Sequence, residues 1–465
     1  GDWEDIQRFR QSFRLMFDAV INHISRQSAW FQAFLRDEKP YTDYFIVADP
    51  AADLSRVIRP RALPLLTEVH TAQASRFVWT TFSDDQIDLN YQSPDVLLEI
   101  VRVLLFYVSQ GADFIRLDAI AFLWKEIGTS CLHLPQTHWI IQLLRLVLNQ
   151  VAPHVLLITE TNVPHKDNLT YFGNGENEAQ MVYNFALPPL VLHTLYQGRA
   201  DVLTSWAQGL QLPSNKVAFL NFLASHDGVG LNPARGILSG EELDNIVQTA
   251  LRNGGLVSFK SEPDGSQSPY ELNINYYDAL NPEGAGEPEE LQIRRFMAAQ
   301  AIMLCLQGTP GIYFHSLFGS RGWLEGVKQT GRNRVINREK LSLQRLELEL
   351  ADPSGRRRQV FDRFRRLLKL RSSQPAFSPF SGQVVLDISP DIFCLLRFSQ
   401  DGEQAVLCLQ NINPTERSYE VALGELSPFK ARQAVELIME RDVEILQGKL
   451  CGSLSPYQTQ WFKLG

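Results

Sequence analysis

The sequence lacks the patterns that bind zinc or build a disulfide framework. Its five cysteines are odd in number and scattered, none is spaced as CxxC, and no HExxH is present. Both a zinc site and a disulfide scaffold are therefore disfavoured. The pattern instead predicts free thiols and, with them, a cytoplasmic location. We expect no metal and no other cofactor.

Positive charge and long apolar runs are also scarce. The formal net charge of −8 disfavours nucleic acid or an anionic membrane surface as a partner. No stretch approaches the ~18 unbroken apolar residues of a membrane span. The chain begins at Gly1 without a methionine, which leaves a preceding segment or signal peptide open. No pattern indicates an oligomeric state.

What is present is an alternation of short apolar runs and longer helical patterns, from residue 13 to about 373. At 465 residues the chain is large enough for one big domain and a smaller one. "SPDVLLEIVRVLLFYVSQG" predicts a helix, with Ser93 as N-cap, Pro94 at its first position and Gly111 just past its end. Six apolar runs have the character of strands buried on both faces of a parallel sheet: "FRLMFDAVI", "DFIRLDAI", "HVLLITE", "QMVYNFA", "AFLNFLAS" and "GIYFHS".

This βα alternation predicts an α/β barrel with an insertion and a C-terminal β domain. We expect the barrel over residues 1–27 and 86–373, and a small inserted subdomain over residues 28–85. Residues 258–289, rich in Gly, Pro, Ser and Asn, predict a long surface loop. Residues 374–465 alternate short apolar strands with turn signals, which is typical of an antiparallel β domain.

Polar residues recur where the expected barrel strands end. In a parallel barrel the active site lies at the carboxyl ends of the strands. A single carboxylate there is usually a helix cap, but four strands with the same feature favour a site. The residues are Asp18, Asn22 and His23 after the first run, Arg116 and Asp118 in the second, Glu160 after the third, and His226 and Asp227 after the fifth.

Carboxylates on neighbouring strands suit retaining glycoside chemistry, in which one attacks the sugar carbon and another protonates the leaving oxygen. Asp118 would attack and Glu160 would donate the proton, while Arg116 on the same strand face would keep Asp118 ionised. Asp227 would then stabilise the positive charge that develops on the sugar ring. His23 and His226 would donate hydrogen bonds to sugar hydroxyls.

The motifs "DAVINH", "FIRLDA", "LLITE" and "ASHD" resemble, in this order, the conserved regions of glycoside hydrolase family 13, the α-amylase clan. Within it the chain is most similar to the sucrose phosphorylase subfamily, through "GDWEDI", "RPRALP", "VWTTFSDDQIDLN", "WKEIGTSCLHLPQTH", "NFALPPLVLHTL", "GTPGIYF" and "GRNRVINR". The resemblance implies a (β/α)8 barrel that lacks its N-terminal strands in this chain, six strands in place of eight.

The resemblance also assigns roles. It implies Asp118 as nucleophile, Glu160 as acid/base and Asp227 as transition-state stabiliser. The implied sugar-binding residues are His23, Phe82, Gln86, Arg116, His226 and Arg334, and the implied phosphate-binding residues are Arg61 and Tyr270. In the family, Arg334 pairs with an aspartate on a strand before "GDWEDI", so the resemblance leaves Arg334 without that partner here. Asn22 lies where some amylases bind calcium, but no further oxygen ligands cluster near it in the sequence.

Two departures from the subfamily concern the acceptor. Phe122 replaces a tyrosine and Ser268 replaces an aspartate, which argues against sucrose itself. "SPYELNINYYDAL" is more similar to the branch that acts on glucosylglycerol, glucosylglycerate or sucrose 6-phosphate, and the sequence does not separate these three.

Three functions stay open at this point. The first is a glucosyl phosphorylase, a hexosyltransferase that passes a glucosyl group from a small α-glucoside to inorganic phosphate through a covalent glucosyl-aspartate. The second is a retaining hydrolase that uses the same residues. The third is an inactive protein of the same fold, if the N-terminal strands are truly absent.

Overall fold

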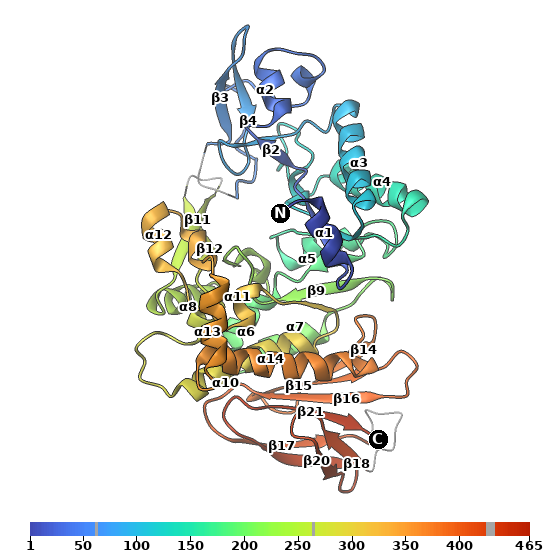
Figure 1. Cartoon of the computed structure of the whole chain (residues 1–465), viewed down its shortest axis with the longest axis vertical. Helices are drawn as coiled ribbons and strands as arrows, with labels where there is room; N and C mark the ends of the chain where they lie inside the picture. The colour runs from blue at the N-terminus through green and yellow to red at the C-terminus, as the bar shows by residue number, and fades with distance from the viewer. Residues whose placement is uncertain (61–63, 263–265, 425–432) are drawn as a thin grey trace. The chain divides into compact units, whose positions relative to one another are not determined.

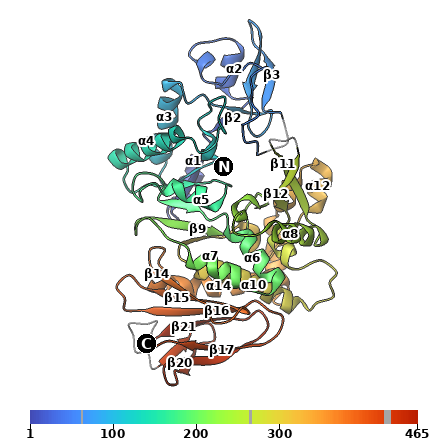
Figure 2. The ribbon, with the colours of Figure 1, turned by 180° about the vertical axis from the view of Figure 1, so that it is seen from behind.

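A computed structural model describes residues 1–60, 64–262, 266–424 and 433–465 (Figures 1 and 2). The described chain divides into two compact units. The first comprises Gly1–Tyr183, Pro213–Val217 and Phe259–Tyr270, and the second comprises Asn184–Leu212, Ala218–Ser258 and Glu271–Gly465.

Parallel strands form the centre of the first unit, in the order β1, β6, β7, β8. The apolar character of these segments explains the arrangement, since Ile115, Leu117 and Leu157 are fully buried. The register sets Asp18 of β1 beside Arg116 of β6, and Leu117 beside Thr159 of β7. Because all the pairs are parallel, the residues that follow the strands gather at one edge. The bounds are β1 Leu15–Ala19, β6 Ala112–Leu117, β7 Leu156–Thr159 and β8 Met181–Tyr183.

The helix predicted before the second of these strands is confirmed. Helix α3 (Pro94–Ser109) begins at the proline, and Ser93 adopts the extended conformation of an N-cap. Gly111 has φ of +90°, which glycine tolerates at the sharp turn into β6. Helices α3 and α4 lie side by side in both views (Figures 1 and 2). The other helices of this unit are α1 Trp3–Arg10, α4 Pro135–Val151 and α5 His165–Leu169.

Residues 23–88 add short elements to the first unit. Strand β2 (His23–Ser25) pairs antiparallel with β5 (Gln86–Asp88), which sets His23 opposite Asp88. Between them in the chain, helix α2 (Ala29–Leu35) precedes a hairpin of β3 (Leu66–His70) and β4 (Ser75–Trp79). Phe31 and Phe34 of α2 are buried and stack on one another, which anchors the helix.

The second unit contains the two remaining barrel strands, which are again parallel: β9 (Ala218–Phe222) and β13 (Thr309–Gly311). Five of the six strands expected from the apolar runs are therefore present. The sixth is displaced, because β13 ends at Gly311, where "GIYFHS" begins, and α11 (Phe314–Leu317) occupies the end of that run. The helices of this unit are α6 Leu187–Gln197, α7 Asp201–Gln208, α8 Gly240–Arg252, α9 Tyr276–Leu280, α10 Glu289–Cys305, α11 Phe314–Leu317, α12 Leu324–Thr330, α13 Leu343–Ala351 and α14 Arg356–Ser372.

An antiparallel sheet forms the C-terminal part of the second unit, in the order β14, β15, β16, β21, β18, β19. Helix α10 packs against β15 and β16, and the sheet lies beside α10 and α14 in Figure 1. The predicted C-terminal β structure is thus confirmed. The bounds are β14 Gly382–Leu386, β15 Ile392–Phe398, β16 Ala405–Asn411, β17 Arg417–Ala422, β18 Gln433–Glu436, β19 Arg441–Glu444, β20 Lys449–Leu454 and β21 Thr459–Leu464, with β17 and β20 paired separately.

The long loop predicted for residues 258–289 is wrong for most of that range. Strands β11 (Leu256–Ser261) and β12 (Gln267–Asn273) and helix α9 occupy much of it. Strand β12 pairs with β10 (Val229–Gly230), so its backbone groups are satisfied by tertiary pairing that local composition does not reveal. The buried Asn273 amide donates to Ser258 Oγ at 2.8 Å, which offsets the cost of burying it.

No helix in the described ranges is long and apolar enough to cross a membrane.

Candidate active site

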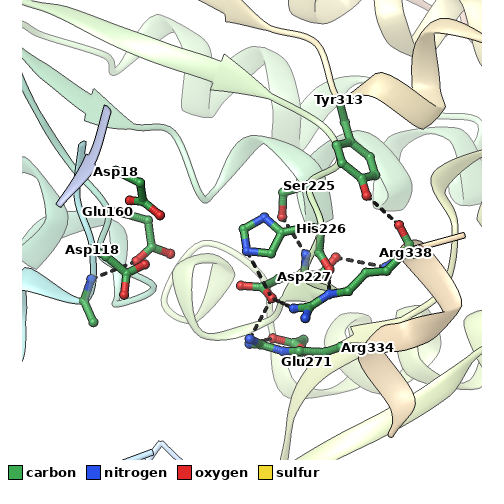
Figure 3. A network of polar contacts seen from close by, with 12 residues as sticks. Asp18, Asp118, Glu160, Ser225, His226, Asp227, Glu271, Tyr313, Arg334 and Arg338 are labelled. Carbon is green, nitrogen blue, oxygen red and sulfur yellow. Dashed lines mark hydrogen bonds and ion pairs between the residues drawn. The ribbon is translucent and has the colours of Figure 1, made fainter. Parts of the chain in front are cut away.

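The Arg116 guanidinium lies close to three carboxylates at the strand ends of the first unit. Arg116 Nη1 lies 2.5 Å from Asp18 Oδ1 and 2.9 Å from Asp118 Oδ1, and its Nη2 lies 3.8 Å from Glu160 Oε2. The three carboxylates appear together in Figure 3. We call Asp18, Arg116, Asp118, Glu160 and Tyr183 the Arg116 cluster. The expectation that Arg116, Asp118 and Glu160 lie close together is met.

Burial and charge act in opposite directions on Arg116. Burial disfavours its charged form, but the negative charges of Glu160, Asp118 and Asp18 outweigh this effect and raise the pKa of Arg116 above its ordinary value. The Tyr183 ring contributes a cation–π contact, with its centroid 5.6 Å from Arg116 Cζ. Burial also raises the pKa of Tyr183 to about 12, so its phenol stays neutral near pH 7.

The backbone turns sharply directly after Asp118. Ala119 has φ of +49°, a left-handed conformation that is costly for a residue with a Cβ. Its N–H donates to Glu160 Oε2 at 3.2 Å (Figure 3). The strained residue thus ties the two candidate catalytic strands together, and such strain often marks a functional position.

His23 of β2 contacts side chains from β5 and from the loop between β4 and β5. The side-chain amide of Gln86 lies 2.7 Å from His23 Nε2, and the Phe82 ring lies 5.3 Å from the imidazole, centroid to centroid. Phe122 packs edge-on against Phe82 at 5.3 Å. The structure therefore brings together His23, Phe82 and Gln86, three residues that the sequence assigned to sugar binding.

The second unit contains a different polar group, which we call the Asp227 cluster: Asp227, Glu271, Arg334 and Arg338. Asp227 Oδ1 lies 2.7 Å from Arg334 Nη1 and accepts from Arg338 Nη2 at 2.8 Å (Figure 3). Arg334 also binds Glu271 with both ends of its fork, through Nε at 2.9 Å and through Nη2. Glu271 is almost completely buried, so this bidentate pair is well shielded from solvent.

Backbone contacts hold Asp227 in addition to the charges. Arg338 Nε donates to the His226 carbonyl at 2.8 Å, and the Asn337 amide donates to the Asp227 carbonyl at 2.9 Å. His226 Nε2 is 3.7 Å from Asp227 Oδ1, and its ring is more than half exposed. His226, Asp227 and Arg334, predicted to belong to one site, therefore lie together.

Two expectations turned out differently, and a third is not tested by the described residues. Arg334 is not left without a carboxylate, because Glu271 and Asp227 both pair with it. Tyr270 lies buried in strand β12 and not in a loop. Arg61 falls outside the described residues.

Sequence reasoning missed Glu271 and Arg338 as members of a site. Glu271 is a charge within the apolar run "YELNI", the same signal as Arg116, but the Gly, Pro, Ser and Asn content of the segment predicts a loop. Arg338 had no such signal, since it lies in a polar stretch after a short 3-10 turn, Asn333–Asn337.

The family model for the alpha amylase catalytic domain matches residues 2–228. A glucosylglycerate phosphorylase from Allomeiothermus silvanus is 48% identical over 462 residues, which cover 99% of this chain and 79% of that protein. The chain therefore belongs to the α-amylase family, a family of enzymes, as its motifs indicated.

Two further similarities agree with this assignment. A glucosylglycerate phosphorylase from Escherichia coli is 45% identical over 465 residues, covering all of this chain and 80% of that protein. The crystal structure of sucrose 6F-phosphate phosphorylase from Thermoanaerobacter thermosaccharolyticum superposes with a TM-score of 0.75 at 24% identity, over 89% of this chain and 82% of that one. The TIM-barrel-like fold predicted from the sequence is confirmed.

Proposed function

We propose that the protein is a glucosyl phosphorylase that converts glucosylglycerate and inorganic phosphate into α-glucose 1-phosphate and glycerate. The similarity to two glucosylglycerate phosphorylases, which spans almost all of this chain, supports both the reaction type and the choice of glycerate as acceptor. The chain's own departures at Phe122 and Ser268 also argue against sucrose.

The proposed mechanism has two displacements. In the first, an Asp118 oxygen attacks the anomeric carbon as the bond to the glycerate oxygen breaks, and Glu160 gives its proton to that oxygen. In the second, a phosphate oxygen attacks the same carbon, returns a proton to Glu160 and releases Asp118. The position of Arg116 supports this order of steps, because Arg116 contacts the carboxylates of Asp118 and Glu160 and holds Asp118 in place.

The remaining residues would bind the substrates. Asp227, held by two guanidiniums, would stabilise the positive charge on the ring. His23, Phe82, Gln86, His226 and Arg334 would contact the glucosyl group, and Arg61 and Tyr270 would contact phosphate. The free cysteines and the use of phosphate as co-substrate support a cytoplasmic location.

The test is a panel of α-glucosides incubated with the protein, with and without phosphate, and assayed for glucose 1-phosphate and glucose. We expect glucose 1-phosphate from glucosylglycerate, only when phosphate is present, and less product from glucosylglycerol and sucrose. Equal release of glucose with and without phosphate would establish hydrolysis. The absence of any product from the whole panel would favour an inactive member of the family.

A further inference from the structure

Lys125 is a buried lysine of the first unit that is linked to His23 through the Asn22 side chain. The Lys125 ammonium is 2.6 Å from Asp88 Oδ2, and it donates to Asn22 Oδ1 at 2.8 Å. The side chains of Lys125 and Asp88 are 2% and 0% exposed, so this pair is withdrawn from water. Burial lowers the pKa of Lys125, and the charge of Asp88 opposes that effect.

Asp88 is surrounded by donors. It accepts from the Thr81 backbone N–H at 3.0 Å, from the Thr81 hydroxyl at 2.6 Å and from Asn22 Nδ2 at 3.2 Å, in addition to the ammonium. A buried carboxylate with this many partners is fixed in orientation. It therefore gives Asn22 and Lys125 a rigid support.

The two charges determine which way the Asn22 amide faces. An ammonium can only donate and a carboxylate can only accept, so the Asn22 oxygen must face Lys125 and its NH₂ group must face Asp88. That NH₂ group also lies 3.3 Å from His23 Nδ1. An amide N–H at this position requires an Nδ1 without a proton.

His23 is kept neutral by its surroundings. Burial lowers the pKa of His23 and outweighs the opposing charges of Asp88 and Asp118, while Lys125 lowers it further. A neutral imidazole has one ring proton, and with Nδ1 acting as acceptor that proton resides on Nε2. Nε2 lies 2.7 Å from the Gln86 side-chain amide nitrogen. A proton on Nε2 therefore requires the Gln86 amide to turn its oxygen toward the ring. The Ser83 hydroxyl, which contacts the Gln86 oxygen, permits this turn because it can accept from the NH₂ group as well as donate.

We propose that Lys125 is a positioning residue, whose ammonium acts through the Asn22 amide to fix His23 in the Nε2–H tautomer. The Nε2–H group, which faces Gln86 in the structure, would then be available to donate to a sugar hydroxyl, a consequence that rests on the role of His23 in the proposed function. The fixed tautomer itself does not depend on that function, so the two can fail separately.

The direct measurement is the ¹⁵N chemical shifts of the His23 ring in the full chain, which distinguish Nδ1–H from Nε2–H. We expect Nε2–H in the unsubstituted protein and a mixture of tautomers in Lys125→Met. Lys125→Met leaves the buried Asp88 carboxylate without its ion-pair partner, and this variant can fail to fold. In that case the same measurement is made on the double variant Asp88→Asn/Lys125→Met. An Nδ1–H tautomer in the unsubstituted protein, or an unchanged Nε2–H tautomer in the variant that folds, would overturn the proposal.

A double-mutant cycle of kcat/KM distinguishes an effect of Lys125 on His23 from a general effect of Lys125 on protein stability. We expect Lys125→Met to lower kcat/KM for phosphorolysis about 100-fold, the scale of a small misplacement of a substrate contact. In a His23→Asn background the same substitution should lower it less than about 3-fold, because the group it positions is gone. Lys463→Met, an exposed lysine on β21, serves as the control without effect. Equal losses in both backgrounds would contradict a route through His23.

Discussion

The Arg116 cluster and the Asp227 cluster have opposite charge patterns. The first has three carboxylates against one guanidinium, a formal charge of −2 when all are ionised. The second has two carboxylates and two guanidiniums, and is formally neutral. A net negative group is suited to attract a substrate that develops positive charge, whereas the balanced group holds the Asp227 carboxylate in a fixed place, from which it would stabilise that charge.

One carboxylate of each cluster differs sharply in solvent exposure. In the Arg116 cluster the Asp18 side chain is 53% exposed, so this carboxylate is well hydrated. In the Asp227 cluster the Glu271 side chain is 2% exposed and depends on Arg334. Substitution of Asp18 should therefore change stability little, whereas a substitution that removes the partner of Glu271 should lower stability.

The largest expected effect is on activity in the Arg116 cluster. Asp118→Asn removes the proposed nucleophile and should lower the phosphorolysis rate by at least ~10³-fold, because nucleophilic and acid/base steps contribute on that order. Mass spectrometry after rapid quenching should detect a glucosyl adduct in the unsubstituted enzyme and none in the variant.

Asp18→Asn is the matched control, since it removes a carboxylate from the same guanidinium. We expect it to lower the rate less than about 10-fold, because Asp18 is exposed and has no proposed bond to make. Retention of most activity in Asp118→Asn would mean that the nucleophile is wrongly assigned. Equal losses in the two variants would mean that only the charge of the cluster matters.

The next effect is on stability in the Asp227 cluster. Arg334→Met leaves the buried Glu271 carboxylate without its bidentate partner, and should lower the free energy of unfolding by about 3–5 kcal/mol. Urea denaturation followed by circular dichroism measures this change.

Two other variants sharpen this prediction. Arg338→Gln alters an exposed partner of Asp227 and should cost under about 1 kcal/mol. Glu271→Gln combined with Arg334→Met removes the buried charge and should recover part of the loss. If Arg334→Met and Arg338→Gln cost the same, burial of Glu271 does not set the strength of this cluster.

The two clusters also differ in how far the sequence predicted them. Asp118 and Glu160 follow mostly apolar strands, so the apolar pattern predicts their positions at strand ends. The parallel register then brings these ends together. Glu271 lies in β12, whose Ser, Pro and Asn content is typical of loops. Its pairing with β10 joins residues about 40 positions apart, and local patterns carry no information on such pairing.

The same limit applies within the first unit. The Lys125–Asp88 pair joins a turn after β6 to strand β5, and each charge alone is an ordinary polar residue in the sequence. Ser93 and Gly111, in contrast, were predicted correctly because helix ends depend on residues that are neighbours in the chain. Local rules thus predicted the elements, while the pairing of buried charges emerged only in the structure.

The smallest expected effect is on the pKa of His23, which responds to the negative charge of the Arg116 cluster. Burial holds the pKa of His23 below 6.5 although the charge of Asp118 raises it, so Asp118→Asn should lower that pKa further. Because the pKa of His23 is lower in the folded state than in the unfolded state, neutral His23 contributes to stability. This contribution is fully present above pH 6.5, the ordinary pKa, and is lost as the pH falls toward the folded-state pKa, since the unfolded state binds the proton first. NMR titration of the His23 ring in Asp118→Asn, with the exposed Asp95→Asn as control, tests the sign. A pKa that rises in Asp118→Asn, or that moves equally in Asp95→Asn, would show that the cluster does not act on His23 through its charge.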